Sequence, residues 1–151
     1  MTAPTPYLIS DLKMEEALRL VAYPDPKSGG APWTIGYGHT GREVHPGLVW
    51  TQTEAETALA GDVGATIRGL DTAIPWWRSL DDLRGDVLID MAFNMGVHEL
   101  LEFHAFLALV KAGSFNHAAL DMMSTPWAHE VGRRADRLER QMATGKHVLL
   151  V

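Results

Sequence analysis

The segment EALRLVAYPDPKSGGAPWTIGYGH, residues 16–39, contains the clearest signals for β-structure in the chain. Its centre, residues 24–32, is rich in proline and glycine, which is typical of a loop that reverses the chain. The residues on either side of this loop, 20–23 and 33–39, are rich in β-branched and aromatic side chains, which favour strands. Residues 44–49 are expected to pair beside the second strand, although a Pro-Gly pair interrupts them. The pattern predicts a small antiparallel sheet.

A short helix is predicted before this stretch. Thr5-Pro6 is typical of an N-cap followed by proline at the first helical position. An apolar stripe at helical spacing follows, formed by Leu8, Ile9 and Leu12. We expect the helix to end at residues 15–17.

The rest of the chain is predicted to be helical. Thr51 and Glu54 form a capping box, which opens a helix that runs to about residue 70. A second capping signal at residues 79–82 opens a helix over 83–94, which is apolar nearly all round and is therefore expected to be central and buried. Glycines at helix ends, and the remaining apolar periodicity, predict a stop at Gly96 and further helices over 99–112, 115–123 and 131–143.

These elements define an α+β fold that is mainly α. We expect one domain over residues 1–151, which is an ordinary length for a single domain. Its small N-terminal lobe, about residues 1–50, carries the β-hairpin. A long helix, about 51–70, joins it to a helical C-terminal lobe, about 71–151.

Composition excludes several classes of protein. The net charge of −6 counts against nucleic acid as the partner. The chain has no cysteine, and none of its seven histidines lies in an HExxH motif, so we expect no metal and no cofactor. The first seven residues do not resemble a secretory signal, and the longest apolar runs are too short for stable membrane insertion. We therefore expect a soluble protein made in the cytoplasm.

Glu16 is the first candidate for chemistry. On a helical wheel it lies about 33° from the centre of the apolar stripe, whereas Glu15 lies about 67° away. A carboxyl held against apolar surface favours its protonated form, which is what a general acid requires. The alternative is that Glu16 only flanks the stripe and reaches solvent or pairs with an arginine.

Asp25 and Thr34 are the next candidates. Asp25 lies between two prolines, which restrict the backbone and so fix the direction of the aspartate. An ionised aspartate and a threonine hydroxyl can together hold and polarise a water for attack at a sugar carbon. Alternatively, Asp25 is a turn residue and Thr34 an ordinary strand residue.

Taken together, Glu16, Asp25 and the run Thr34-Ile-Gly-Tyr-Gly-His39 resemble the signature of the phage-type lysozymes, glycoside hydrolase family 24. The resemblance implies a lysozyme-like fold. It also implies that Glu16 is the general acid and that Asp25 and Thr34 position the nucleophilic water. The eight residues between Asp25 and Thr34 make a longer loop than the T-even phage relatives have.

Later segments support the same resemblance, which covers about residues 5–145. They are Leu88 to Gly96 and the block that contains Trp127, Arg134 and Thr144-Gly145. The resemblance implies that Arg134 is a basic partner near Glu16 and that Asn94, where the T-even relatives have glutamine, binds substrate. Arg134 is also a candidate for substrate binding, as is Tyr37 inside the first motif.

Other polar and aromatic residues have simpler interpretations. His39 is predicted to anchor the hairpin. The basic run 133–140 is predicted to be a solvated helix face, with Arg134 as the exception. Trp76, Trp77 and Trp127 are expected to be buried in the helical lobe, with stacking on sugar rings as the alternative.

The function implied by the resemblance is hydrolysis of the β-1,4 bond between N-acetylmuramic acid and N-acetylglucosamine in peptidoglycan, with inversion and without a cofactor. The alternatives are a lytic transglycosylase, a chitin-directed hydrolase, and a non-catalytic wall-binding or virion structural module. The expected partner is the glycan strand. We expect a monomer that stays in the host cytoplasm until a separate holin-like factor releases it.

Overall fold

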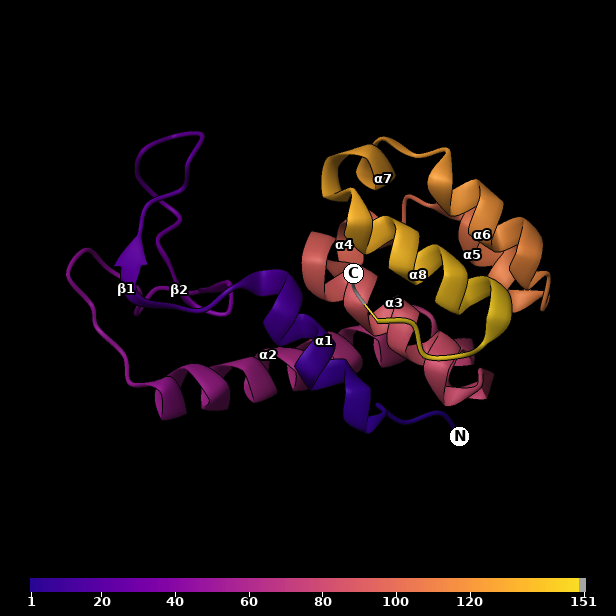
Figure 1. The fold of residues 1–151 in the computed structure, drawn as a ribbon, viewed down its shortest axis with the longest axis horizontal. Helices are drawn as coiled ribbons and strands as arrows, with labels where there is room; N and C mark the ends of the chain where they lie inside the picture. Colours follow the sequence, from indigo (N-terminus) through magenta and orange to yellow (C-terminus); the bar gives the residue numbers. More distant parts are fainter. Residues whose placement is uncertain (150–151) are drawn as a thin grey trace. The chain divides into compact units, whose positions relative to one another are not determined.

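The computed structural model describes residues 1–149. It is mainly helical with one small antiparallel sheet, which confirms the predicted α+β class (Figure 1). The chain divides into two compact units, which we call the sheet unit and the helical unit. The sheet unit is Leu12–Ala65; the helical unit combines Met1–Asp11 with the chain from Thr66 onward. The unit boundaries fall inside helices α1 (Pro6–Glu16) and α2 (Gln52–Ala73).

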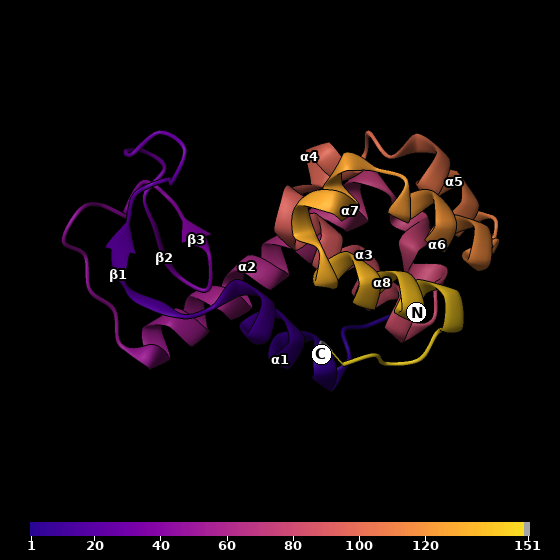
Figure 2. The ribbon, with the colours of Figure 1, turned by 45° about the horizontal axis from the view of Figure 1, so that its top comes forward.

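Three strands form the sheet of the sheet unit in the order β1-β2-β3, and both neighbouring pairs are antiparallel (Figure 2). They are β1 (Arg19–Tyr23), β2 (Thr34–Gly36) and β3 (His39–Thr40). The register aligns Tyr23 with Thr34. The sheet therefore uses the predicted proline- and glycine-rich loop as the connection between its first two strands.

The predicted strand over residues 33–39 is wrong in its length, and residues 44–49 do not pair beside it. The chain turns at Tyr37 and Gly38, because Gly36 and Gly38 adopt positive φ angles of 68° and 78° that an extended strand does not contain. The second partner of β2 is therefore β3, two residues further on. Residues 44–49 contribute only an isolated bridge, from Val49 to Val21.

The core of the sheet unit lies beneath this hairpin. Ile35 is fully buried with Ala22 and Val44, and partly buried Trp33, Leu48 and Trp50 pack against them. Gly36 lies directly against the Trp50 ring, and a Cβ there would come within 3.1 Å of it. The close packing of Trp50 thus depends on glycine at this position.

Helical capping follows the sequence signals in most places. Thr51 and Glu54 form the predicted capping box: the Glu54 amide donates to the Thr51 hydroxyl at 3.2 Å, and the Thr51 amide donates to the Glu54 carboxylate at 3.0 Å. Helix α2 continues three residues beyond the predicted end, to Ala73. In the second signal, the capping residue is Asp81, whose carboxylate accepts from the Arg84 amide.

After α2, the described part of the helical unit, which ends at residue 149, contains a 3-10 helix and six further α-helices. They are η1 (Pro75–Ser79), α3 (Asp82–Met95), α4 (Val97–Leu100), α5 (His104–Lys111), α6 (Phe115–Met123), α7 (Pro126–Val131) and α8 (Arg133–Thr144).

The helices observed after α3 differ from the prediction in two places. The predicted helix 99–112 is interrupted at residues 101–103, which separate α4 from α5. The prediction also missed α7, although Thr125 caps it and proline occupies its first position. Gly132, with a φ of 56°, separates α7 from α8.

Helix α3 is the central element of the helical unit, as predicted. Its residues from Gly85 to Ala92 are all buried, and both views show α8 lying along it (Figures 1 and 2). Trp77 and Phe106 are fully buried in the same core. No helix within residues 1–149 combines the length and the apolar character needed to span a membrane.

Candidate active site

The three residues predicted to be catalytic all lie in the sheet unit. Glu16 is the last residue of α1 and is half-buried. Ala17, which follows it, has a φ of 48°, the left-handed conformation that a non-glycine residue rarely adopts. The helix therefore ends abruptly, and Glu16 lies at the point where the chain turns toward β1.

The carboxylate of Glu16 lies against the hairpin turn. A Cβ built on Gly38 would be 3.1 Å from Glu16 Oε2. Because Gly38 has no side chain and a positive φ, its backbone comes closer to the carboxylate than any other residue would allow. The hairpin turn thus forms one wall of the space around Glu16.

Asp25 and Thr34 lie at the same end of the β1–β2 pair. The register aligns Tyr23 with Thr34, so Thr34 opens β2 where β1 ends, and Asp25 follows β1 by two residues. Both residues are half-buried. The sheet thus brings together two residues that an eight-residue loop separates in sequence.

Backbone hydrogen bonds fix the position of Asp25 within its loop. The Asp25 amide donates to the carbonyl of Gly30 at 2.9 Å, and the Gly29 amide donates to the carbonyl of Asp25 at 2.8 Å. Its carboxylate accepts only a long bond from the Lys27 amide among the contacts described, at 3.3 Å. The loop therefore holds the backbone of Asp25, while its carboxylate can accept further hydrogen bonds.

Tyr37, the candidate for substrate binding in this unit, is mostly withdrawn from solvent. Its side chain is only 6% exposed. The ammonium of Lys13 lies 5.9 Å from the ring centroid and also pairs with Glu56 at 2.7 Å. The ring thus helps to join α1 to the hairpin turn, and its role in substrate binding stays a prediction.

His39 links the hairpin to α2, in agreement with its interpretation as an anchor. Its Nδ1 lies 2.8 Å from Asp62 and its Nε2 lies 2.6 Å from Glu43. Partial burial lowers the pKa of His39, but the hydrogen bonds to Glu43 and Asp62 outweigh that effect and raise the pKa above its ordinary value. The same bond to His39 lowers the pKa of Glu43.

The other two predicted substrate-binding residues lie in the helical unit. Asn94 is exposed, and its side-chain oxygen accepts a hydrogen bond of 2.7 Å from the indole nitrogen of Trp127. This bond fixes the orientation of the amide. Arg134 is buried, and its Nε donates to Asp90 at 2.8 Å.

The interpretation of residues 133–140 as a solvated face is wrong for Arg137, which is only 3% exposed. Its guanidinium donates to Asp90 at 2.8 Å, to Gln141 at 3.1 Å and to Asp11 at 3.4 Å. Sequence reasoning missed this buried network. The available signal was Asp90 itself, a carboxylate within the apolar run 87–92 of the predicted central helix, because a buried charge requires partners.

The described residues contain no group of three or more histidine, aspartate or glutamate side chains placed to hold a metal ion. Glu16 lies beside the hairpin turn, and Asp25 and Thr34 lie at one end of the β1–β2 pair. Together, the mainly helical fold and the placement of these side chains around a hairpin define a lysozyme-like protein.

Comparison with known proteins identifies the family. The family described as Phage lysozyme matches residues 13–144, and the chain therefore belongs to the phage lysozyme family. This range contains all three residues predicted to be catalytic.

Individual relatives come from different sources. The chain is 28% identical over 98 residues, 63% of its length, to "Probable T4-type lysozyme 1" of Dictyostelium discoideum. It is 33% identical over 118 residues, 76% of its length, to an endolysin of Bacillus phage B103. It is 29% identical over 159 aligned residues, 89% of its length, to the pre-baseplate central spike protein Gp5 of Enterobacteria phage T4. The matches span 58%, 42% and 27% of these relatives, less than two thirds of each.

Proposed function

We propose that this protein is a lysozyme that hydrolyses the β-1,4 bond between N-acetylmuramic acid and N-acetylglucosamine in bacterial peptidoglycan. The observation that carries the proposal is the approach of Gly38 to the Glu16 carboxylate in a member of the phage lysozyme family. A glutamate at a helix end, walled by a hairpin turn, is suited to deliver a proton to a bound glycosidic oxygen.

In the proposed mechanism, Glu16 donates its proton to the leaving oxygen as the glycosidic bond breaks. Asp25 accepts a hydrogen bond from a water, and the hydroxyl of Thr34 orients the same water toward the sugar carbon. Attack from the face opposite to the leaving group gives inversion, and the water's proton passes to Asp25. Placement of Asp25 and Thr34 at one end of the β1–β2 pair supports their shared role.

We also propose that Asn94, Arg134 and Tyr37 contact the glycan strand. The bond from Trp127 leaves the amide nitrogen of exposed Asn94 as a donor for sugar hydroxyl or acetamido oxygens. Asp90 orients the guanidinium of Arg134.

The test compares the wild type with Glu16→Gln, and Glu15→Gln, which changes the preceding residue of α1, serves as the matched control. We expect the wild type and Glu15→Gln to clear suspensions of outer-membrane-permeabilised bacteria and to release reducing ends, and Glu16→Gln to lose at least about a hundredfold in rate. Circular dichroism checks that all three are equally folded. Substantial activity in Glu16→Gln would refute the role of Glu16.

A lytic transglycosylase would use the same acid but would form a 1,6-anhydro product, because no water attacks. Mass spectrometry of the released fragments distinguishes the two reactions. We expect hydrated reducing ends only, and an anhydro ring would refute the role given to Asp25 and Thr34.

The similarity to the T4 central spike protein favours a second candidate function, that of a domain in a virion structural protein. Binding to purified walls without release of reducing ends by the wild type would establish this candidate over the lysozyme. A chitin-directed hydrolase is distinguished in the same assay by replacing the walls with chitin.

We further propose that the protein acts as a monomer and remains in the host cytoplasm until a holin-like factor releases it. The similarity to phage endolysins supports this proposal. Expression of the chain alone is expected to leave host cells intact, and spontaneous lysis would contradict it. Sedimentation of the purified protein tests the oligomeric state.

A further inference from the structure

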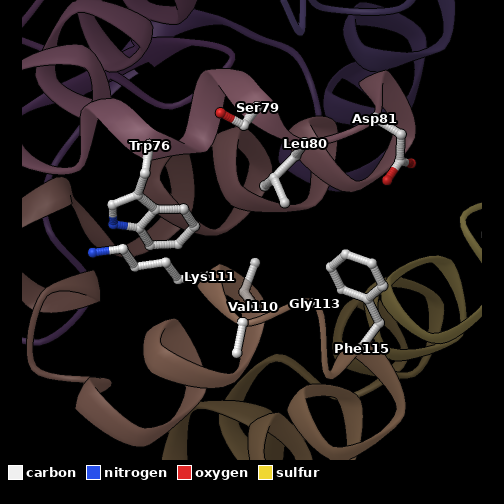
Figure 3. Close-up of a pocket in the computed structure, with 9 residues that line it drawn as sticks. Trp76, Ser79, Leu80, Asp81, Val110, Lys111, Gly113 and Phe115 are labelled. Atoms are coloured by element: carbon white, nitrogen blue, oxygen red, sulfur yellow. The ribbon is translucent and has the colours of Figure 1, made fainter.

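The helical unit contains a pocket of about 550 Å³ that the proposed mechanism does not use. Three segments line it: η1 with the residues after it, the end of α5, and the start of α6 (Figure 3). The residues proposed to be catalytic belong to the sheet unit, so this pocket is a separate feature of the chain.

Aromatic and aliphatic side chains form the inner surface of the pocket. In Figure 3, the indole of Trp76 lies toward one end and the ring of Phe115 toward the other, with Leu80 and Val110 between them. Trp76 and Phe115 are both half-buried and both line the pocket, and the guanidinium of Arg84 lies over the Phe115 ring, 3.8 Å from its centroid. Ring surface that stays accessible in a folded protein can still be buried by a ligand.

The neighbouring tryptophan shows that Trp76 is not simply a core residue. Trp77 is fully buried, and its indole nitrogen donates to Asp71 at 2.8 Å. The guanidinium of Arg78 lies over the Trp77 ring, 4.6 Å from the ring centroid. Of two adjacent tryptophans, one is thus built into the core with its polar atom satisfied, and the other faces the pocket.

The polar groups of the pocket favour an anionic ligand. Figure 3 shows the Lys111 amino group beside the Trp76 indole, and exposed Ser79 also lines the pocket. Lys111 is exposed and makes no ion pair with any described residue. The carboxylate of Asp81, by contrast, is already engaged with the backbone amide and guanidinium of Arg84, each at 3.2 Å. The uncompensated charge of the pocket is therefore positive.

An N-acetylated sugar that carries a carboxylate combines the chemical features that this pocket would recognise. The C–H face of a pyranose ring and the methyl of an acetamido group are apolar and can pack on aromatic rings. The hydroxyl and amide groups can bond to Ser79, and a carboxylate can form a charge-assisted hydrogen bond with Lys111. Because Arg84 covers one face of Phe115, Trp76 is the aromatic ring of the pocket that is better suited to stack on a sugar.

We propose that this pocket is a second binding site for an acidic, N-acetylated glycan strand, with Trp76 as its stacking platform and Lys111 as its anion contact. The proposal rests on the proposed function, because it assigns the pocket to the same polymer. A second contact with an insoluble polymer raises the effective concentration of the enzyme at its substrate. It therefore increases the rate on intact walls more than the rate on short soluble fragments.

Binding is measured in the Glu16→Gln background, so that no probe is consumed. The probes are soluble glycan strands of alternating N-acetylglucosamine and N-acetylmuramic acid, and neutral N-acetylglucosamine oligomers of equal length. Isothermal titration gives the Kd, and amide NMR shifts locate the contact. We expect Trp76→Ala to raise the Kd for both probes about three- to tenfold.

Lys111→Gln keeps the aromatic surface and removes only the charge, so it tests the site without disturbing Trp76. We expect it to weaken binding of the acidic strand several-fold and to leave the neutral oligomer unchanged. Lys146→Gln, an exposed lysine of the same unit, is the matched control and is expected to change neither Kd. An equal effect of Lys111→Gln and Lys146→Gln, or no NMR shifts around Trp76, would overturn the proposal.

Activity is then compared in variants that retain Glu16. We expect Trp76→Ala and Lys111→Gln to slow the clearing of intact walls while the hydrolysis of short soluble fragments stays at the wild-type rate. Equal losses on both substrates would refute a second site. The wild type could hydrolyse neither substrate while the titrations still show a preference for the acidic strand that depends on Lys111. That result would refute the proposed catalysis and support the binding site.

Discussion

The contact between Gly38 and Glu16 can be tested separately from backbone strain. Gly38 and Gly47 have φ angles of 78° and 86°, so alanine is strained at both positions. A Cβ at Gly38 meets Glu16 Oε2 at 3.1 Å, whereas a Cβ at Gly47 meets nothing within 4 Å. The two substitutions to alanine therefore differ in whether they disturb the carboxylate.

We expect Gly38→Ala and Gly47→Ala each to lower the free energy of unfolding by about 1–2 kcal/mol, because each forces a side chain into the left-handed region. Only Gly38→Ala is expected to reduce the rate of wall hydrolysis, by tenfold or more. Urea unfolding and the clearing assay provide the two measurements. Similar activity in both variants would show that the Gly38 approach has no catalytic consequence.

Asp86 is a second residue with a measurable effect. It is buried on α3, and its carboxylate accepts hydrogen bonds from the amide and the hydroxyl of Thr5. Burial raises the pKa of Asp86 to about 6, although the bonds from Thr5 act in the opposite direction. The folded state therefore binds a proton more tightly than the unfolded state does.

Because the folded-state pKa exceeds the unfolded value, this group lowers stability as the pH rises from about 4 to about 6. Asp86→Asn keeps an acceptor for the Thr5 amide and supplies a donor to its hydroxyl. We expect it to stabilise the protein by about 1–2 kcal/mol at pH 7.5, after allowance for solvent screening, and by little at pH 4. Asp136→Asn, exposed on α8, is the control in urea titrations at both pH values. An equal effect of Asp86→Asn at the two pH values would contradict a raised pKa of Asp86 as the cause.

At the scale of the element, His39 connects the hairpin to α2 through Asp62 and to the following loop through Glu43. A protonated imidazole can donate from both ring nitrogens, so the two carboxylates stabilise the charged form. A raised pKa means that this stabilisation is fully present below the unfolded value of about 6.5 and is lost as the pH rises through the folded value.

We therefore expect His39→Asn to lower the free energy of unfolding more at pH 5.5 than at pH 8.5. His45→Asn, whose ring bonds only to the neighbouring Pro46 carbonyl at 2.9 Å, is the matched control and is expected to show no such difference. Thermal unfolding across this pH range checks the slope. Retention of the wild-type slope in His39→Asn would show that another group produces it.

The elements that were predicted correctly are specified by residues that lie close together in the sequence. The capping box at Thr51 and the apolar stripe through Leu12 are each formed by residues a few positions apart. The observed helices α2 and α1 contain these signals. The hairpin could not be placed in the same way. Positive φ at Gly36 and Gly38 ends β2 after three residues, and nothing in a run of strand-favouring side chains specifies that turn.

The candidate site also combines features that the sequence predicts with features that it does not. Glu16, Asp25 and Thr34 were found by spacing and resemblance, and their roles stay predictions. The approach of Gly38 to Glu16 depends on where the hairpin turns, and the burial of Arg137 depends on Asp11 and Asp90, far apart in sequence. Interactions of this kind follow from tertiary packing, which a single sequence does not display.

In the molecule as a whole, polar contacts between residues far apart in sequence connect residues 1–11 to the rest of the helical unit. Arg137 of α8 donates to Asp90 of α3 and to Asp11 of α1, and His147 also bonds to Asp11 at 3.0 Å. The ring of His147 stacks on Tyr7 at 3.9 Å. Residues 1–11 thus belong to the helical unit, while the same helix α1 continues into the sheet unit to Glu16.

Replacement of Arg137 with methionine tests how strongly the two units depend on this network. Methionine preserves helix propensity and much of the volume, but it leaves Asp11 and Asp90 with less compensating positive charge. We expect Arg137→Met to lower the free energy of unfolding by about 3–5 kcal/mol. Arg140→Met, exposed on the same helix, is expected to cost under about 0.5 kcal/mol.

Because α1 and α2 continue across both unit boundaries, loss of this network should reach the sheet unit as well. NMR signals of Ile35, in the core of the sheet unit, and Ile89, in α3, report on the two units separately. We expect both to unfold at the same lowered urea concentration in Arg137→Met. A transition that shifts for Ile89 alone would show that the sheet unit, with Glu16, Asp25 and Thr34, is stable independently of the helical network.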